Sequence, residues 1–185
     1  ISNNLKKYKY NIFEVYSLNI LSILSIFFFL SFFKFIIIFI YYIFFGLSFL
    51  NLFFFDWKKI NNKISILITF IIILTGYTLS ISSYPYLEWD AAVNWIFKVI
   101  NFKNNFSFEN LKNVPGVIEY PHIGTYIWAM FWRASFIDYE YTGRIVLLFI
   151  YLISFLTLIS NAKLEDIKKI LLLIFIVTIA FDNIL

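Results

Sequence analysis

The sequence predicts an all-α protein, a polytopic transmembrane helix bundle of about five spans with a long, partly helical external loop after the third span. Of its 185 residues, 62% are hydrophobic and only 14% are charged, whereas a soluble domain carries about 25% charged residues. Crossing ~30 Å of hydrocarbon takes roughly 20 apolar helical residues. Five stretches contain no charged residue: 15–33, 35–55, 64–87, 145–162 and 170–181. This pattern excludes a soluble enzyme and a disordered chain, and the absence of cysteine excludes a disulfide scaffold.

The lysines set the expected topology, because Lys and Arg near the ends of spans stay on the cytoplasmic side. Three clusters are expected to share that side: Lys6, Lys7 and Lys9; Lys58, Lys59 and Lys63; and Lys163, Lys168 and Lys169. Lys34 fits a tight external turn between the first two spans, with its side chain reaching toward water. We therefore expect two N-terminal transmembrane helices and a cytoplasmic loop over 1–63, followed by a core over 64–185. The core should consist of a span 64–82, an external loop 83–143, a span 144–161, a cytoplasmic loop 162–168 and a span 169–185.

The external loop holds six of the eleven acidic residues and the single histidine, and long loops of this kind usually carry function. Its first part, 87–102, has the spacing of a two-faced helix. The predicted apolar stripe is Ala91, Trp95 and Val99, and the predicted polar stripe is Asp90, Asn94 and Lys98. We therefore expect an external helix that presents both kinds of face.

A second apolar segment of the loop, 123–137, is interrupted by Arg133. If it crossed the membrane, Asp138 and Glu140 would become cytoplasmic and the lysines of 163–169 would become external. Both consequences oppose the positive-inside bias. We expect a helix that lies in the outer interface and does not span.

Two carboxylates are the first candidates for chemistry. Taken alone, Asp90 is typical of the acidic residues that stabilise a helix N-terminus, and Asp182 is typical of a solvated residue at the end of a span. The lysine topology nevertheless places both on the external face. Two carboxylates at one interface can hold a divalent cation such as Mg²⁺ or Mn²⁺, or divide the roles of base and metal ligand.

Basic side chains on the same side could meet a phosphate group. Lys98, Arg133 and Arg144 are all external in this topology, although Arg144 also suits a plain interfacial anchor. His122 has no second His or Cys with zinc-site spacing. A structural or hydrogen-bonding role is favoured for it, with a substrate contact as the alternative.

Four short segments together resemble a known family. They are 88–98 (EWDAAVNWIFK), 120–129 (YPHIGTYIWA), 140–145 (EYTGRI) and 180–185 (AFDNIL). In this order they resemble four motifs of GT-C-fold integral membrane glycosyltransferases. The first two are the acidic motif of the first external loop and the later part of that loop with its amphipathic helix. The last two are the start of the next span and the second acidic motif. The members most similar in pattern are the protein mannosyltransferase and aminoarabinose transferase types. The resemblance covers 64–185 and implies that the chain is an N-terminal fragment of such an enzyme.

The resemblance implies transfer of a sugar from a polyprenyl-phosphate donor to a lipid, glycan or protein acceptor at the external face of a bacterial inner (plasma) membrane. Asp90 matches the essential acid, which serves as base or acceptor-activating group. Asp182 matches the acid associated with a divalent metal or with the orientation of the donor phosphate. The positions for donor-phosphate or substrate binding are Lys98, Tyr120, His122 and Arg144. Tyr120 stands where some members carry Lys, and His122 replaces Pro or Leu, so the chain departs from the family at both.

The alternative is a non-catalytic polytopic membrane protein, either a transporter or a scaffold subunit. A transporter places ionisable groups near the midplane of its spans, and none of the five uncharged stretches contains an acid. This favours chemistry at the membrane surface. The net charge of +4 lies in short loops and reports topology, not nucleic-acid binding. With so few spans the donor groove would be incomplete, and we expect the isolated chain to be inactive.

Overall fold

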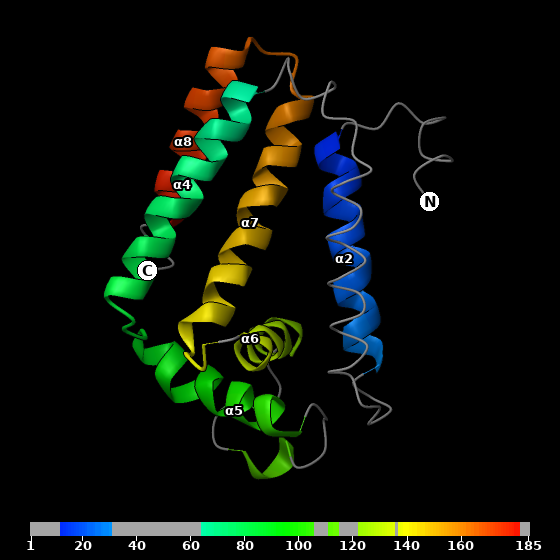
Figure 1. Cartoon of the computed structure of the whole chain (residues 1–185), viewed down its shortest axis with the longest axis vertical. Helices are drawn as coiled ribbons and strands as arrows, with labels where there is room; N and C mark the ends of the chain where they lie inside the picture. Colours follow the sequence, from blue (N-terminus) through cyan, green and yellow to red (C-terminus); the bar gives the residue numbers. More distant parts are fainter. Residues whose placement is uncertain (1–11, 31–63, 106–110, 115–121, 136, 182–185) are drawn as a thin grey trace. The chain divides into compact units, whose positions relative to one another are not determined.

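The computed structural model describes residues 12–30, 64–105, 111–114, 122–135 and 137–181 (Figure 1). Every regular element in these ranges is a helix, which confirms the all-α prediction for this part of the chain. In chain order the elements are α2 (Ile12–Leu30), α4 (Ile64–Ser83), the π-helix η5 (Ala91–Trp95), α5 (Ile96–Asn105), the 3₁₀ turn η6 (Leu111–Asn113), α6 (Ile123–Ala134), α7 (Tyr141–Asn161) and α8 (Asp166–Phe181).

Among the described helices, α4 and α7 are long and apolar enough to cross a membrane. Their bounds agree with the predicted spans 64–82 and 144–161. Only 17% of the most apolar stretch of α4 is buried, and a helix that is apolar on all sides must be covered by protein or by lipid. The structure thus supports membrane-spanning character for these two helices.

The other predicted spans are only partly described. Helix α2 occupies most of the stretch 15–33, and α8 begins at Asp166, inside the predicted cytoplasmic loop, and runs for 16 residues. The predicted second span and the lysines of 1–11 and 31–63 lie outside the described residues.

The chain forms two compact units. The first combines Ile1–Ser22, Asp56–Leu79 and Leu148–Leu185. Within it, polar side chains link α2 to α7: the hydroxyl groups of Ser17 and Thr157 lie 2.6 Å apart, and Asn161 Nδ2 donates to Glu14 Oε1 at 2.6 Å. Such contacts between apolar helices hold the helices in register.

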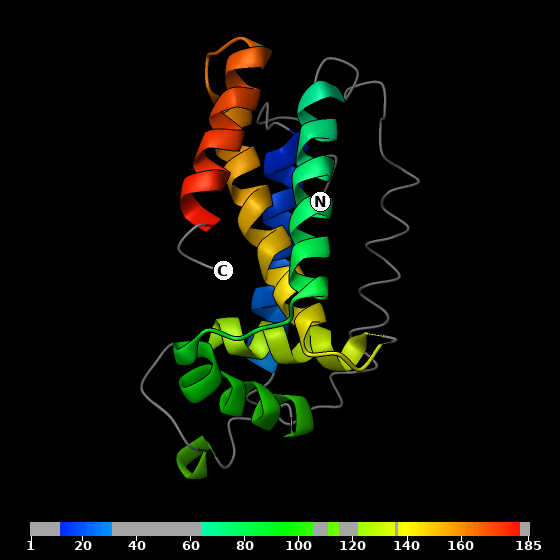
Figure 2. The same ribbon diagram turned by 90° about the vertical axis from the view of Figure 1, so that its left-hand side faces the viewer.

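The second unit combines Ile23–Phe55 and Ser80–Leu147 and contains the predicted external loop. In it α5 packs against α6, as Figure 2 shows. The rings of Phe102 and Tyr126 meet edge to face with centroids 5.5 Å apart, and both side chains are fully buried. Helix α6 has 12 residues, so at 1.5 Å per residue it is about 18 Å long. This is shorter than the roughly 20 residues that cross a membrane, and the location of this helix in the outer interface stays a prediction.

A glycine lets α7 begin directly against α6. A Cβ atom added at Gly143 would lie 2.2 Å from the backbone oxygen of Trp128, closer than any side chain tolerates. The same tryptophan donates its Nε1–H to the backbone oxygen of Glu140 at 3.1 Å. The corner between the two helices therefore requires the absence of a side chain at Gly143.

We predict that Gly143→Ala destabilises the protein by roughly 2–3 kcal/mol, because the corner must open to admit the methyl group. The matched control is Gly124→Ala, since a Cβ at Gly124 meets nothing within 4 Å and alanine favours the helix. The apparent midpoint of thermal unfolding in detergent should fall for the first variant only. Equal midpoints for the two variants would show that the corner is not tightly packed.

Candidate functional site

Asp90 lies at the start of a helical segment that runs from Trp89 to Asn105, called here segment 89–105. The segment begins with π-helical turns, in which the N–H of Ile96 bonds to the carbonyl of Ala91, five residues back. Two side chains hold the exposed Asp90 carboxylate: Asn94 Nδ2 donates to Oδ1 at 2.5 Å and Trp95 Nε1 donates to Oδ2 at 2.7 Å. Both carboxylate oxygens are thus oriented by their own helix.

These hydrogen bonds lower the pKa of Asp90 below its ordinary value, with Asn94 contributing most and Trp95 next. Donors to the charged form of a carboxyl group favour ionisation. Asp90 is therefore a fixed, negatively charged acceptor at neutral pH.

Lys98 lies on the buried side of the same segment, with 1% of its surface exposed. Its Nζ lies 5.4 Å from the ring centroid of Trp95, a favourable cation–π distance. Burial lowers the pKa of Lys98. Burial also lowers the pKa of His122, and the positive charge of Lys98 lowers it further.

Two of the predicted donor-phosphate residues, Lys98 and His122, are therefore near enough in the fold for the charge of one to affect the pKa of the other. The predicted polar stripe is wrong for Lys98, because this side chain is buried whereas Asp90 is exposed. The physical reason is the packing of α5 against α6, which buries Lys98 and which the pattern of residue types along one helix does not specify. Trp95 connects the two, because its Nε1 bonds to Asp90 and its ring lies beside Lys98.

Sequence reasoning missed this role of Trp95, which it placed on the apolar stripe. The available signal was the spacing of an acid followed by hydrogen-bond donors four and five residues later.

Arg144 is held by neighbouring groups of the protein. It forms a two-pronged ion pair with Glu140, with Nε to Oε1 at 2.9 Å and Nη2 to Oε2 at 3.0 Å, and Nη1 donates to the backbone oxygen of Tyr86 at 2.8 Å. Burial raises the pKa of Glu140, and Arg144 opposes that effect. Arg144 thus links the connection between α4 and Asp90, through Tyr86, to the start of α7. It holds that connection in position.

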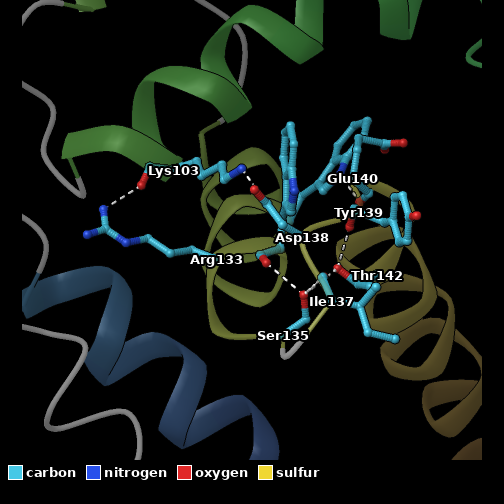
Figure 3. A network of polar contacts seen from close by, with 10 residues as sticks. Lys103, Arg133, Ser135, Ile137, Asp138, Tyr139, Glu140 and Thr142 are labelled. Atoms are coloured by element: carbon cyan, nitrogen blue, oxygen red, sulfur yellow. Dashed lines mark hydrogen bonds and ion pairs between the residues drawn. The ribbon is translucent and has the colours of Figure 1, made fainter.

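A second polar network joins the ends of α5 and α6 (Figure 3). Lys103 Nζ bonds to Asp138 at 2.5 Å and lies 4.0 Å from the ring centroid of Trp132. Arg133 Nη1 donates to the backbone oxygens of Lys103 and Asn104 at 2.7 and 3.1 Å. Arg133, predicted as a phosphate-binding cation, here binds the terminal carbonyl groups of α5.

The remaining predicted site residues, Tyr120 and Asp182, lie outside the described residues. The proximity of Asp182 to Asp90 therefore stays a prediction, and so does a metal bound between them. Within the described part of the chain, no group of three or more His, Cys, Asp or Glu side chains is arranged to hold a metal ion. Both oxygens of Asp90 bind donors of its own helix.

Comparison of the chain with protein-family models, with curated proteins and with solved structures finds no match in any of the three.

We predict that Trp95→Phe raises the pKa of Asp90 toward its ordinary value, because the phenyl ring keeps the bulk and lacks the Nε1–H donor. The measurement is carboxylate titration of protein labelled with ¹³C at the aspartate side chain, with Asp90→Asn to assign the signal. Trp128→Phe is the matched control, since its indole donates to a backbone oxygen elsewhere. An unchanged titration in Trp95→Phe would contradict the hydrogen bond.

The Lys103–Asp138 pair should make stability depend on acid pH. The hydrogen bond from Lys103 is the main cause that lowers the pKa of Asp138 in the folded protein, so its contribution is present above about pH 4 and is lost as the pH falls further. We predict that Asp138→Asn weakens this part of the pH dependence of the unfolding midpoint. In a Lys103→Gln background the same change should have little further effect. Additive effects of the two substitutions would exclude the pairing.

Proposed function

We propose that the chain is part of an integral membrane glycosyltransferase of GT-C type, which moves a sugar from a polyprenyl-phosphate donor to a lipid, glycan or protein acceptor. The observation that carries the proposal is the exposed Asp90 carboxylate, oriented by Asn94 and Trp95. It follows the apolar helix α4 by a short connection. The resemblance of 64–185 to GT-C enzymes supports the same assignment.

The proposed role of Asp90 follows from its ionisation. A carboxylate with a lowered pKa is a weak proton acceptor, and it is well suited to orient an acceptor hydroxyl group. It is equally suited to stabilise the positive charge that develops on the sugar ring as the bond to phosphate breaks. We therefore assign Asp90 to acceptor activation, with electrostatic stabilisation as its main contribution.

The proposed donor-phosphate contacts are Lys98 and His122. Both lie where burial disfavours their charged forms, and a phosphate group that approached them would favour those forms. This would couple donor binding to ionisation of the pair. Arg144 contributes by holding the connection that precedes Asp90, and Tyr120 and Asp182 remain candidates for substrate and metal contacts.

The proposal includes a bundle of about five spans, with 83–143 on the external side of a bacterial inner membrane. The two long apolar helices α4 and α7 support a membrane location. The side of the membrane follows from the lysine distribution alone.

The test is sugar transfer in native membranes that contain the complete enzyme of which this chain is proposed to be part, assayed with a panel of radiolabelled polyprenyl-phosphate sugars. We predict that Asp90→Asn lowers transfer by a factor of at least about 100, comparable to the loss of one group that stabilises charge in a transition state. The matched control is Glu88→Gln, which removes an exposed carboxylate two residues earlier and should retain transfer. Equal transfer by Asp90→Asn and wild type, or transfer from no donor of the panel, would reject the proposal in favour of a non-catalytic membrane protein.

A further inference from the structure

The middle of α6 is enclosed by protein on every side. Six consecutive residues, 125–130, are buried, and at 3.6 residues per turn they go more than once around the helix. Helix α5 covers one side, and the start of α7 meets Trp128 at Gly143. The fully buried ring of Tyr126 shows which further element completes the enclosure.

That element is the C-terminal part of α2, through Phe28. The ring of Phe28 meets the ring of Tyr126 edge to face with centroids 5.7 Å apart, and both residues belong to the second unit. Leu24, one turn earlier on α2, is also buried, whereas the adjacent Phe29 has 62% of its surface exposed. This part of α2 therefore turns the face with Leu24 and Phe28 toward the protein.

Tyr126 connects Phe28 to His122 through a third aromatic ring. Phe102 meets Tyr126 edge to face at 5.5 Å and meets the ring of His122 edge to face at 6.2 Å. The backbone N–H of Tyr126 and the hydroxyl group of Thr125 both donate to the carbonyl of His122 at 2.9 Å. The backbone of His122 is thus held by α6, and its ring lies against Phe102.

These contacts make the position of His122 depend on α2. Edge-to-face aromatic contacts have a preferred geometry, and a packed interior leaves few voids into which a ring can move. Loss of the Phe28 ring would leave room beside Tyr126. Tyr126 and then Phe102 could shift into that space, and water would reach His122 more easily.

We propose that Phe28 is a positioning residue for His122, and that α2 is therefore part of the candidate donor-phosphate site. Phe28 acts through Tyr126 and Phe102 and not on a substrate. Helix α2 lies outside 64–185, the range that resembles GT-C enzymes, so the resemblance gives it no role. The effect on the position of His122 is independent of the proposed function, and only its consequence for donor binding rests on that function.

The chain contains a single histidine, so protein labelled with ¹³C and ¹⁵N at histidine, and purified without a histidine tag, gives signals from His122 alone. Phe28→Leu removes the ring and keeps an apolar side chain. The matched control is Phe29→Leu, the same change at the adjacent exposed position. Both variants are titrated in detergent micelles beside the wild type.

We expect Phe28→Leu to move the imidazole signals toward those of free histidine. It should also raise the pKa of His122 toward its ordinary value, because burial is the main cause that lowers this pKa. Lys98, the charged group that also lowers it, is present in every variant. Phe29→Leu should leave the signals and the pKa as in the wild type.

Two further variants decide whether the effect depends on the chain of aromatic rings. Phe28→Tyr restores a ring and should keep the wild-type signals, and in a Tyr126→Leu background Phe28→Leu should change the His122 signals little further. Unchanged signals in Phe28→Leu, an equal effect of Phe29→Leu, or additive effects of the changes at 28 and 126 would each overturn the proposal. If Phe28→Leu does not fold, Phe28→Met replaces it, because this flexible side chain fills the space without a ring.

Sugar transfer by the complete enzyme separates this proposal from the proposed function. Phe28→Leu should raise the KM for the polyprenyl-phosphate donor and leave kcat nearly unchanged, since donor binding is affected and Asp90 is not. Transfer with an unchanged donor KM in this variant would overturn the role of α2 in the donor site. Absence of transfer by the wild type would reject the proposed function alone, because the His122 signals decide the positioning role without it.

Discussion

The edge-to-face contact of Phe102 with Tyr126 holds segment 89–105 against α6, and most of the second unit depends on it. Both rings are fully buried, so this contact determines which side of the segment faces the protein. Lys98 follows onto the buried side because it lies one turn before Phe102. The same packing leaves Phe97 exposed.

The π-helical stretch gives the two ends of this segment different functions. After the π-helical stretch, the regular helix α5 packs on α6 and its Lys98 side chain is buried. Within it, the widened turn brings Trp95 over the Asp90 carboxylate. π turns of this kind occur often at functional sites because they place side chains where a regular helix cannot. Here the carboxylate of Asp90 is exposed, and two hydrogen bonds from its own helix nevertheless fix its orientation.

The start of α7 is a second fixed point. Gly143 permits close contact with the backbone of Trp128. The next residue, Arg144, forms an ion pair with Glu140 and donates a hydrogen bond to the backbone carbonyl of Tyr86. A partly buried guanidinium with such partners is geometrically well defined. It fixes the path by which the chain approaches Asp90, and a direct contact of Arg144 with phosphate stays a prediction.

The sequence by itself determined the helical class, the approximate bounds of α4 and α7 and the presence of a helix within 123–137, because these depend on runs of apolar residues and on where charge interrupts them. It also singled out Asp90 as a candidate. Only the tertiary structure decided that Lys98 is buried, that it neighbours His122 and that Trp95 bonds to Asp90. These facts depend on a change of helical register and on packing between segments distant in the chain, and a periodic pattern of residue types specifies neither.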